Sequence, residues 1–403
     1  MQTAIEPDRT TFDRPTSIPP HIKAHDLLVG LGVHLAPSTS LLLLAGLAAE
    51  RPLLLMGLPG QAKTQLARAI GEVLAPGRTR VLNAALTSFD DVRGFIRPSS
   101  LDKGVPEIIP GPWSPYRDEL LFVDELSRAP SHQQSRWLQL LHERLVDGQP
   151  TDLRWVLAAM NPPSVDGTFP LGLATADRFL AVLSLEDFGE LDPTDRLRIT
   201  MGDVGRDGVL SRAEATVLLP GWLAAVRGEA DKVRHEPLTR LLLGQVVDAA
   251  LTAFRASPGA PFSPQGRRAV LLFDLLSWAL AALRVEVGGN AMDTLGDMLD
   301  ELLVSGLVEV GRACACDETA LLRAHDEAWK AAIRAWEAFG QDGGRDAMVD
   351  QTLDRGDRAT VARLARSELE RSTLDADRAT RLIVAWWGAP MPMALAPREE
   401  VPA

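Results

Sequence analysis

Residues 57–64 have the residue types of a phosphate-binding loop. Their sequence is Gly-Leu-Pro-Gly-Gln-Ala-Lys-Thr, and they lie between an apolar run, residues 52–56, and a helix-forming run, residues 65–70. A glycine-rich turn between a strand and a helix can direct backbone N–H groups at an anion, and the helix N-terminus adds positive charge. The pattern therefore predicts a site for the phosphates of a nucleotide.

Individual residues of this loop have distinct predicted roles. Lys63 would reach the β- and γ-phosphates, and the Thr64 hydroxyl would hold Mg²⁺. The residue before the lysine is normally glycine, and Ala62 departs from that pattern. The alternative is an ordinary strand-to-helix turn with a surface lysine. The predicted nucleotide contacts are Gly57, Leu58, Pro59, Gly60, Gln61, Ala62, Lys63 and Thr64, together with Asp124.

Two neighbouring carboxylates follow a second apolar run. Residues 120–123 are typical of a buried parallel strand, and Asp124 and Glu125 come directly after them. Ligands of open α/β sheets bind at the carboxyl ends of strands. We expect Asp124 to hold Mg²⁺ through water and Glu125 to polarise the water that attacks the γ-phosphate. Alternatively, the strand merely ends in two solvated acids.

A polar amide follows a third apolar run. Residues 154–160 predict another buried strand, Asn161 comes next, and Pro162 stops the strand. An amide at this position would contact both the γ-phosphate and the attacking water. The alternative is a turn residue before a proline.

Seven motifs, taken in order, resemble one family. They are residues 57–64, 111–113, 121–130, 142–146, 159–162, 167–170 and 176–179. Over about residues 25–285 the sequence resembles the MoxR-like branch of the AAA+ ATPases. The resemblance implies the α/β class, with an AAA+ P-loop NTPase core built on a parallel sheet, then an all-α lid and an α-helical C-terminal extension. It also implies ATP and Mg²⁺ as cofactors and a homo-oligomeric ring, usually a hexamer.

The same resemblance implies what the ring does. It implies ATP hydrolysis that drives remodelling of a protein substrate, commonly with a von Willebrand factor A domain protein as partner. By the family pattern, Asp124 and Glu125 are the acidic pair and Asn161 is the first sensor. An alternative of another class is an ATP-gated assembly scaffold with little or no hydrolysis.

Four arginines are candidates for further roles that the resemblance implies. Arg178 is the candidate arginine finger that reaches the neighbouring subunit's site, where it would neutralise transition-state charge. Arg128 is a second candidate at the subunit interface. The second sensor is assigned to Arg268, and Arg267 stays open, because the family usually has the arginine directly after the proline and here two residues intervene.

The composition of the chain argues against a nucleic-acid-binding protein and against a membrane-spanning protein. The chain has 403 residues, of which 46% are hydrophobic, and a net charge of −12. Without a basic tract, no nucleic-acid partner is expected, and a nucleic-acid motor is disfavoured. Cys314 and Cys316 are one residue apart, which indicates a reducing cytoplasm rather than a structural disulfide. No apolar run is long enough to span a membrane, so we expect a cytoplasmic protein.

The predicted domains are a flexible arm (1–20), the AAA+ core (21–188), a helical lid (189–290), a helical C-terminal extension (291–390) and a disordered tail (391–403). Residues 203–214 have acidic residues, a glycine and a final Glu214 at the positions of a calcium loop. Alternatively, Ser211 is the N-cap of a lid helix, as in the family.

Overall fold

The computed structural model describes residues 21–101, 107–201 and 210–340. The predicted arm, the predicted tail and residues 341–390 of the predicted extension lie outside these ranges. The predicted domain boundaries remain predictions.

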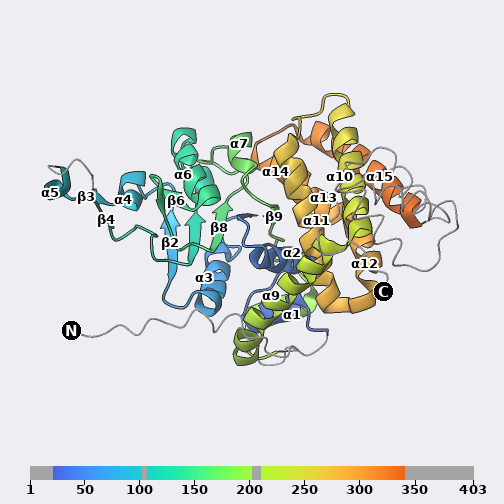
Figure 1. Ribbon diagram of the computed structural model, residues 1–403, viewed down its shortest axis with the longest axis horizontal. Helices are drawn as coiled ribbons and strands as arrows, with labels where there is room; N and C mark the ends of the chain where they lie inside the picture. The colour runs from blue at the N-terminus through green and yellow to red at the C-terminus, as the bar shows by residue number, and fades with distance from the viewer. Residues whose placement is uncertain (1–20, 102–106, 202–209, 341–403) are drawn as a thin grey trace, which may run out of the picture.

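A five-stranded parallel sheet lies at the centre of the N-terminal part (Figure 1). In spatial order its strands are β2 (Thr79–Asn83), β5 (Leu120–Asp124), β8 (Trp155–Met160), β1 (Leu53–Met56) and β9 (Val182–Ser184). The apolar side chains of β1, β5 and β8 are buried, as expected for parallel strands covered on both faces. The predicted α/β fold with a parallel sheet is confirmed.

The order of the strands places the phosphate-binding loop near the middle of one edge. β1 pairs with β8 on one side and with β9 on the other. The residues that follow β1 therefore lie close to those that follow β8, and β5 is the next strand beyond β8. Because all five strands run in the same direction, their carboxyl ends meet at one edge of the sheet.

Helices cover both faces of this sheet. In Figure 1, α3 (Lys63–Leu74) and α6 (Ser131–Glu143) lie on opposite sides of it. In α3 the buried residues Leu66, Ile70 and Val73 recur at helical spacing and so form one apolar face. Three short helical segments complete this part: α4 (Phe89–Arg93), the 3₁₀ turn η2 (Leu126–Arg128) and α7 (Leu173–Ala176).

Two small hairpins extend from the core. β3 (Phe95–Ile96) pairs antiparallel with β4 (Ile108–Ile109), and α5 (Pro98–Leu101) follows β3. β6 (Leu145–Val146) pairs antiparallel with β7 (Gln149–Pro150). The first hairpin lies in the glycine- and proline-rich stretch before β5 and reaches the far end of the molecule in Figure 1.

The rest of the described chain is helical. Two helices precede β1, α1 (Ala24–Gly30) and α2 (Pro37–Ala48). After β9 come α8 (Pro193–Met201), α9 (Arg212–His235), α10 (Pro237–Ala256), α11 (Gly266–Val287), the 3₁₀ turn η3 (Gly288–Asn290), α12 (Ala291–Asp297), α13 (Leu299–Leu303), the π-helix η4 (Val304–Val308), α14 (Glu309–Ala313) and α15 (Glu318–Gly340).

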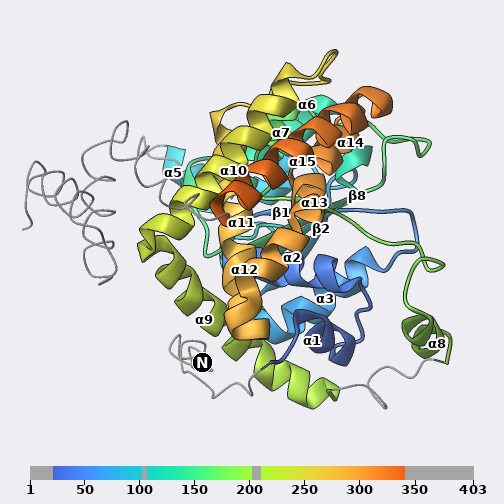
Figure 2. The same ribbon diagram turned by 90° about the vertical axis from the view of Figure 1, so that its right-hand side faces the viewer.

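α11 joins the helical part to the core. It packs against α2, α9, α10 and α12, and α15 lies beside α10 (Figure 2). The backbone of the last region also reaches the core, because the N–H of Leu171 donates to the carbonyl of Ala313 at 2.9 Å. Among the described residues, no helix combines the length and the apolarity needed to cross a membrane.

Glu286, near the end of α11, is buried against the start of α1. Its Oε1 accepts the backbone N–H of Ala24 at 2.5 Å. Burial raises the pKa of the Glu286 carboxyl to about 7, with Asp26 acting in the same direction and Lys23 in the opposite one. The folded chain therefore holds this proton more tightly than the unfolded chain does.

We predict that Glu286→Gln, which keeps the acceptor for Ala24, stabilises the protein at high pH. The stability linked to this proton is complete below pH 4.5 and is lost as the pH rises through about 7. A pKa of about 7 in place of 4.5 corresponds to about 3 kcal/mol. Urea unfolding should show a gain of up to about 3 kcal/mol at pH 8 and almost none at pH 4.5. An equal effect at both pH values would contradict this assignment.

Candidate nucleotide site

The loop after β1 uses left-handed backbone at two positions. Gly60 has φ 93°, and Ala62 has φ 53° and ψ 21°. Glycine adopts this conformation freely, whereas an L-residue pays roughly 1 kcal/mol for it. The glycine that normally precedes the lysine therefore suits the left-handed backbone of this position. Ala62 adopts the same conformation at a cost in conformational energy. Ala62 keeps the turn that starts α3 at Lys63.

Lys63 lies at the centre of the site. Its Nζ donates to the carbonyls of Gly57 and Leu58, at 2.7 and 2.9 Å, and to Oδ1 of Asn161 at 3.1 Å. Burial lowers the pKa of the Lys63 ammonium, and the charges of Asp124 and Glu125 oppose that shift. A buried ammonium held by neutral oxygens is well placed to interact with an anionic ligand.

The hydroxyl and carboxylate predicted to hold Mg²⁺ are in direct contact. Oγ1 of Thr64, in the first turn of α3, donates to Oδ2 of Asp124, at the end of β5, at 2.6 Å. Oxygen atoms of this kind are the ligands that Mg²⁺ takes in nucleotide sites. These residues fit the metal that the loop implies.

Asn161, directly after β8, has an unused donor. Its backbone N–H donates to Oγ of Ser127 at 3.2 Å, and its Oδ1 accepts from Lys63. Its Nδ2 is buried and has no hydrogen-bond partner within the described part of the chain. Because a buried donor without an acceptor is costly, this amide fits an acceptor supplied by a ligand, such as a phosphate oxygen or water.

Glu125 lies next to this group on a turn with positive φ, at 57°. Its Oε2 is 2.7 Å from Nε of Arg128, three residues further on in η2. Arg128 is thus the counter-ion of Glu125 in the same chain. About half of its side chain is exposed, so it is also accessible from outside the subunit.

Gln61 connects the loop to the segment after β9. Its Oε1 accepts the N–H of Leu58 at 2.6 Å, and its Nε2 donates to Oδ1 of Asp187. The remaining predicted loop residue, Pro59, forms the exposed turn with Gly60. The predicted loop residues, Asp124, Glu125 and Asn161 are therefore brought together at the carboxyl edge of the sheet.

Arg178 lies at the opposite edge of the sheet, where the amino ends of the strands meet. The N–H of Leu180 donates to the carbonyl of Pro52, so the residues just before β9 lie beside the start of β1. The length of β1, roughly 13 Å for its four residues, separates this edge from the loop. Nε of Arg178 is buried and lacks a hydrogen-bond partner among the residues described. The structure thus does not bring Arg178 to the loop of its own chain.

The placement of Arg268 differs from the expectation for a sensor of the bound nucleotide. Its side chain is 0% exposed, and its guanidinium donates to Oδ1 of Asp177 and to the carbonyls of Ala176 and Phe179. Burial lowers the pKa of Arg268, and the charge of Asp177 opposes that shift. In this conformation Arg268 is a buried brace for the segment that carries Arg178, because every guanidinium nitrogen is already bonded there.

Arg267 is the more accessible of the two arginines. Its Nε donates to the carbonyl of Asp177 at 2.8 Å, and its Nη2 is 2.9 Å from the ring of His142. Burial and the charge of Arg178 lower the pKa of His142. Arg178 and Arg267 therefore share one surface with His142, away from the loop.

Sequence reasoning missed four residues of this arrangement. Ser127 and Asp177 lie inside family motifs, each directly before an arginine with a predicted role, and that position was the available signal. His142 also lies in a motif, but its contact with Arg267 joins elements far apart in the sequence. Asp187 offered no local signal, because only the fold brings it to Gln61.

Comparison with known proteins agrees with this geometry. Residues 52–181 match the model of the ATPase family associated with various cellular activities (AAA). Chaperone MoxR1 of Mycobacterium tuberculosis is 30% identical over 145 residues, which are 34% of this chain and 37% of that protein. The chain carries an AAA+ domain of the MoxR-like kind.

A second curated relative and a solved structure are also similar to part of this chain. The uncharacterized protein YeaC of Bacillus subtilis is 31% identical over 151 residues, which are 36% of this chain and 46% of that protein. The matched regions thus span less than half the length of either curated relative. A solved structure of a proposed ATPase from Cytophaga hutchinsonii aligns at 22% identity with a TM-score of 0.43, over 64% of this chain and 78% of that one.

The calcium-loop candidate lies largely outside the described residues, which resume at residue 210. Within the described part, Ser211 is the N-cap of α9 and forms a capping box with Glu214. The N-cap prediction for Ser211 is confirmed, and the Glu214 carboxylate is engaged with the Ser211 hydroxyl and N–H.

We predict that Ala62→Gly stabilises the AAA+ domain by about 0.5–1 kcal/mol. Removing the left-handed penalty outweighs the extra chain entropy of glycine. The matched control is Ala69→Gly in the middle of α3, which should destabilise by about 1 kcal/mol or more. Urea unfolding measures both. Destabilisation of similar size at the two positions would contradict the strain assigned to Ala62.

Proposed function

We propose that this protein is an ATP-hydrolysing AAA+ ring protein that remodels partner proteins. The observation that carries the proposal is the group formed by Lys63, Thr64, Asp124 and Asn161, with the free Nδ2 of Asn161 facing no acceptor among the described residues. Separate elements supply these residues, and their chemistry matches a triphosphate with a divalent cation. The AAA+ match supports nucleotide binding at the level of the family.

Each residue has a role in the proposed reaction. Lys63 neutralises charge on the β- and γ-phosphates, and its present carbonyl partners hold it in position. Glu125 orients and polarises the attacking water, and Asn161 donates its free N–H to the γ-phosphate or that water. Mg²⁺ held by Thr64 and Asp124 would offset the negative charge that develops on the phosphate oxygens.

Glu125 is paired with Arg128, which affects how it would act. While Arg128 holds the carboxylate at 2.7 Å, the carboxylate is less available to water. Because Arg128 is half exposed, a neighbouring subunit or partner protein can compete for it. We propose that this exchange frees Glu125, which makes Arg128 a regulator of hydrolysis at the interface.

The nucleoside half has a neighbouring cavity. A cavity of about 470 Å³ lies between residues 35–37 and the segment after β9, and its lining includes His25, Glu186, Glu190 and Asp195. The segment that lines it is also tied to the loop through Gln61 and Asp187. Because this segment adjoins the loop, we propose the cavity for that half of ATP.

Arg178 requires a second subunit. It lies at the amino edge of the sheet, far from its own loop, with a buried donor that has no acceptor in the described chain. A head-to-tail ring, which we propose to be a hexamer, would bring this edge to the loop of the next subunit. The MoxR-like resemblance supports a von Willebrand factor A domain partner in the cytoplasm.

We predict that Glu125→Gln keeps ATP binding and lowers turnover at least 100-fold, because only the general base is lost. Lys63→Ala should weaken ATP binding itself. Equilibrium binding of a fluorescent ATP analogue and release of phosphate over many turnovers separate the two effects. Normal turnover by the glutamine variant would refute the role of Glu125. ATP binding without turnover by the wild-type chain, with and without a partner, would favour the scaffold instead.

We predict that Arg178→Ala lowers hydrolysis by a factor of 10³ or more without changing nucleotide affinity in the monomer. Mixing this variant with Glu125→Gln should restore part of the activity, because a mixed pair has one intact base facing one intact arginine. Arg323→Ala, which removes an exposed arginine on α15, is the control for loss of positive charge. No recovery in the mixture would mean that Arg178 acts within its own chain.

A further inference from the structure

We propose that α8 of one subunit docks in the groove between α10 and α11 of the next subunit. This proposal rests on the ring proposed above and names the surfaces that would join it. The two surfaces lie at separate places on the molecule: in Figure 2, α8 is at the right-hand edge, well apart from α10 and α11. Surfaces that are different and separated form head-to-tail contacts, which close into rings.

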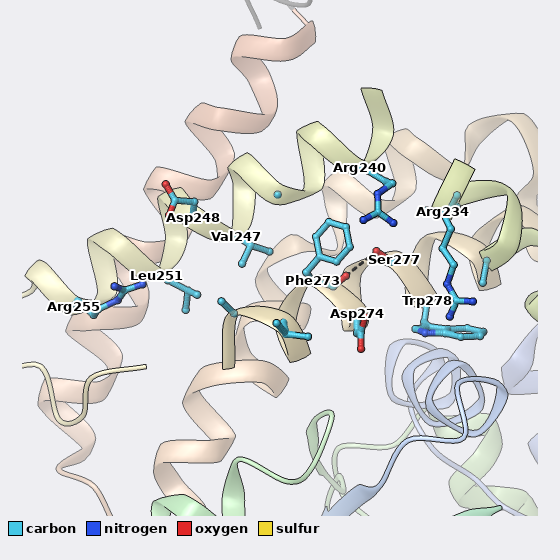
Figure 3. Close-up of a pocket in the computed structure, with 15 residues that line it drawn as sticks. Arg234, Arg240, Val247, Asp248, Leu251, Arg255, Phe273, Asp274, Ser277 and Trp278 are labelled. Carbon is cyan, nitrogen blue, oxygen red and sulfur yellow. Dashed lines mark hydrogen bonds between the residues drawn. The ribbon is translucent and has the colours of Figure 1, made fainter. Parts of the chain in front are cut away.

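The groove is an apolar cavity with a basic rim. It has a volume of about 510 Å³ between α10, α11 and the end of α9 (Figure 3). Val247, Leu251 and Phe273 form apolar parts of its lining. The guanidinium of Arg240 lies 5.4 Å from the ring of Phe273, and that of Arg234 lies 5.5 Å from the ring of Trp278.

The charges of the groove are unbalanced. Arg234, Arg240 and Arg255 line it, and neither Arg240 nor Arg255 pairs with a carboxylate in the described part of the chain. Of its own acids, Asp274 is already paired with Arg51 at 2.7 Å, which leaves Asp248. An occupant with apolar side chains and acidic residues beside them would fit this lining.

α8 and the residues before it have that composition. Leu197 and Met201, one turn apart on α8, are 57% and 58% exposed, and Phe188 is also exposed. Glu190 and Asp192, just before the helix, are exposed acids. The arginines of α8 are held internally: Arg196 donates to the carbonyl of Gly189, and Arg198 pairs with the buried Asp195.

Each of the two docking surfaces lies beside one part of the proposed active site: α8 lies near the phosphate-binding loop, and the groove lies near Arg178. On one side, Asp187 ties the segment before α8 to Gln61 of the phosphate-binding loop. On the other, Arg267, Val270 and Asp274 recur at helical spacing along α11, so the groove continues the surface of Arg178 and His142. Bringing Arg178 to a neighbour's loop therefore brings this groove towards the neighbour's α8.

The test mixes two variants of the full chain. One carries Leu197→Asp and Met201→Asp on α8, and the other carries Arg240→Glu and Val270→Asp in the groove. Leu197, Met201 and Val270 are exposed and Arg240 is half-buried, and thermal unfolding checks that each variant folds. Val217→Asp is the matched control, because Val217 is 61% exposed on α9 against 58% for Val270.

Light scattering on a sizing column, with Mg²⁺ and a non-hydrolysable ATP analogue, measures the mass. We expect rings from the wild type and the control, and monomers from each variant alone, with assembly weakened at least tenfold. An equimolar mixture of the two variants should yield dimers and nothing larger, since each pair has one intact α8 and one intact groove.

Other outcomes overturn one proposal or the other. If both variants form rings, or if their mixture stays monomeric, α8 and the groove are not partners, whereas the proposed ATPase is untouched. If the groove variant assembles normally and exposes residues 341–403 to protease, that segment of the chain occupies the groove. If the wild type binds the analogue and stays monomeric, the proposed ring itself fails.

Discussion

The charge balance around Lys63 constrains the rest of this structure. A buried ammonium is stable here because the carbonyls of Gly57 and Leu58 and the amide of Asn161 accept its hydrogen bonds, with Asp124 and Glu125 nearby. These partners come from the ends of separate parallel strands. The sheet must therefore keep its order and register for the lysine to remain buried, and the same order leaves a free amide donor on Asn161 within the described chain.

The opposite edge of the sheet is organised by arginines rather than acids. Arg268 is fully buried and braces residues 176–179 from the start of α11. That brace fixes Arg178, whose buried Nε has no acceptor in the described chain. One subunit thus presents one part of an anion site at each edge of the sheet. Lys63 and the amide of Asn161 lie at the carboxyl edge, and Arg178 lies at the amino edge, so the two parts would bind one anion together only when two subunits meet. This complementarity is the physical reason to propose a ring.

The C-terminal helices contact both edges. Glu309, on α14 just after the π-helix, is buried near Ser184 at the end of β9, and burial raises the pKa of its carboxyl. Ser184 pairs with Met56, the residue before the loop. Four residues after Glu309, the carbonyl of Ala313 binds the N–H of Leu171, close to the segment that carries Arg178. A displacement of α14 would therefore disturb contacts at both edges of the sheet.

The sequence by itself determined the parallel sheet, the phosphate-binding loop and the acidic strand end, because glycine spacing, apolar runs and carboxylates at strand ends are local features. It could not determine that Arg268 is a buried brace, that Arg128 pairs with Glu125, or that Gln61 reaches Asp187. The pairing of Arg128 depends on the turn at Glu125, and the other contacts join segments roughly 90 to 130 residues apart. Only tertiary packing decides which donors remain free.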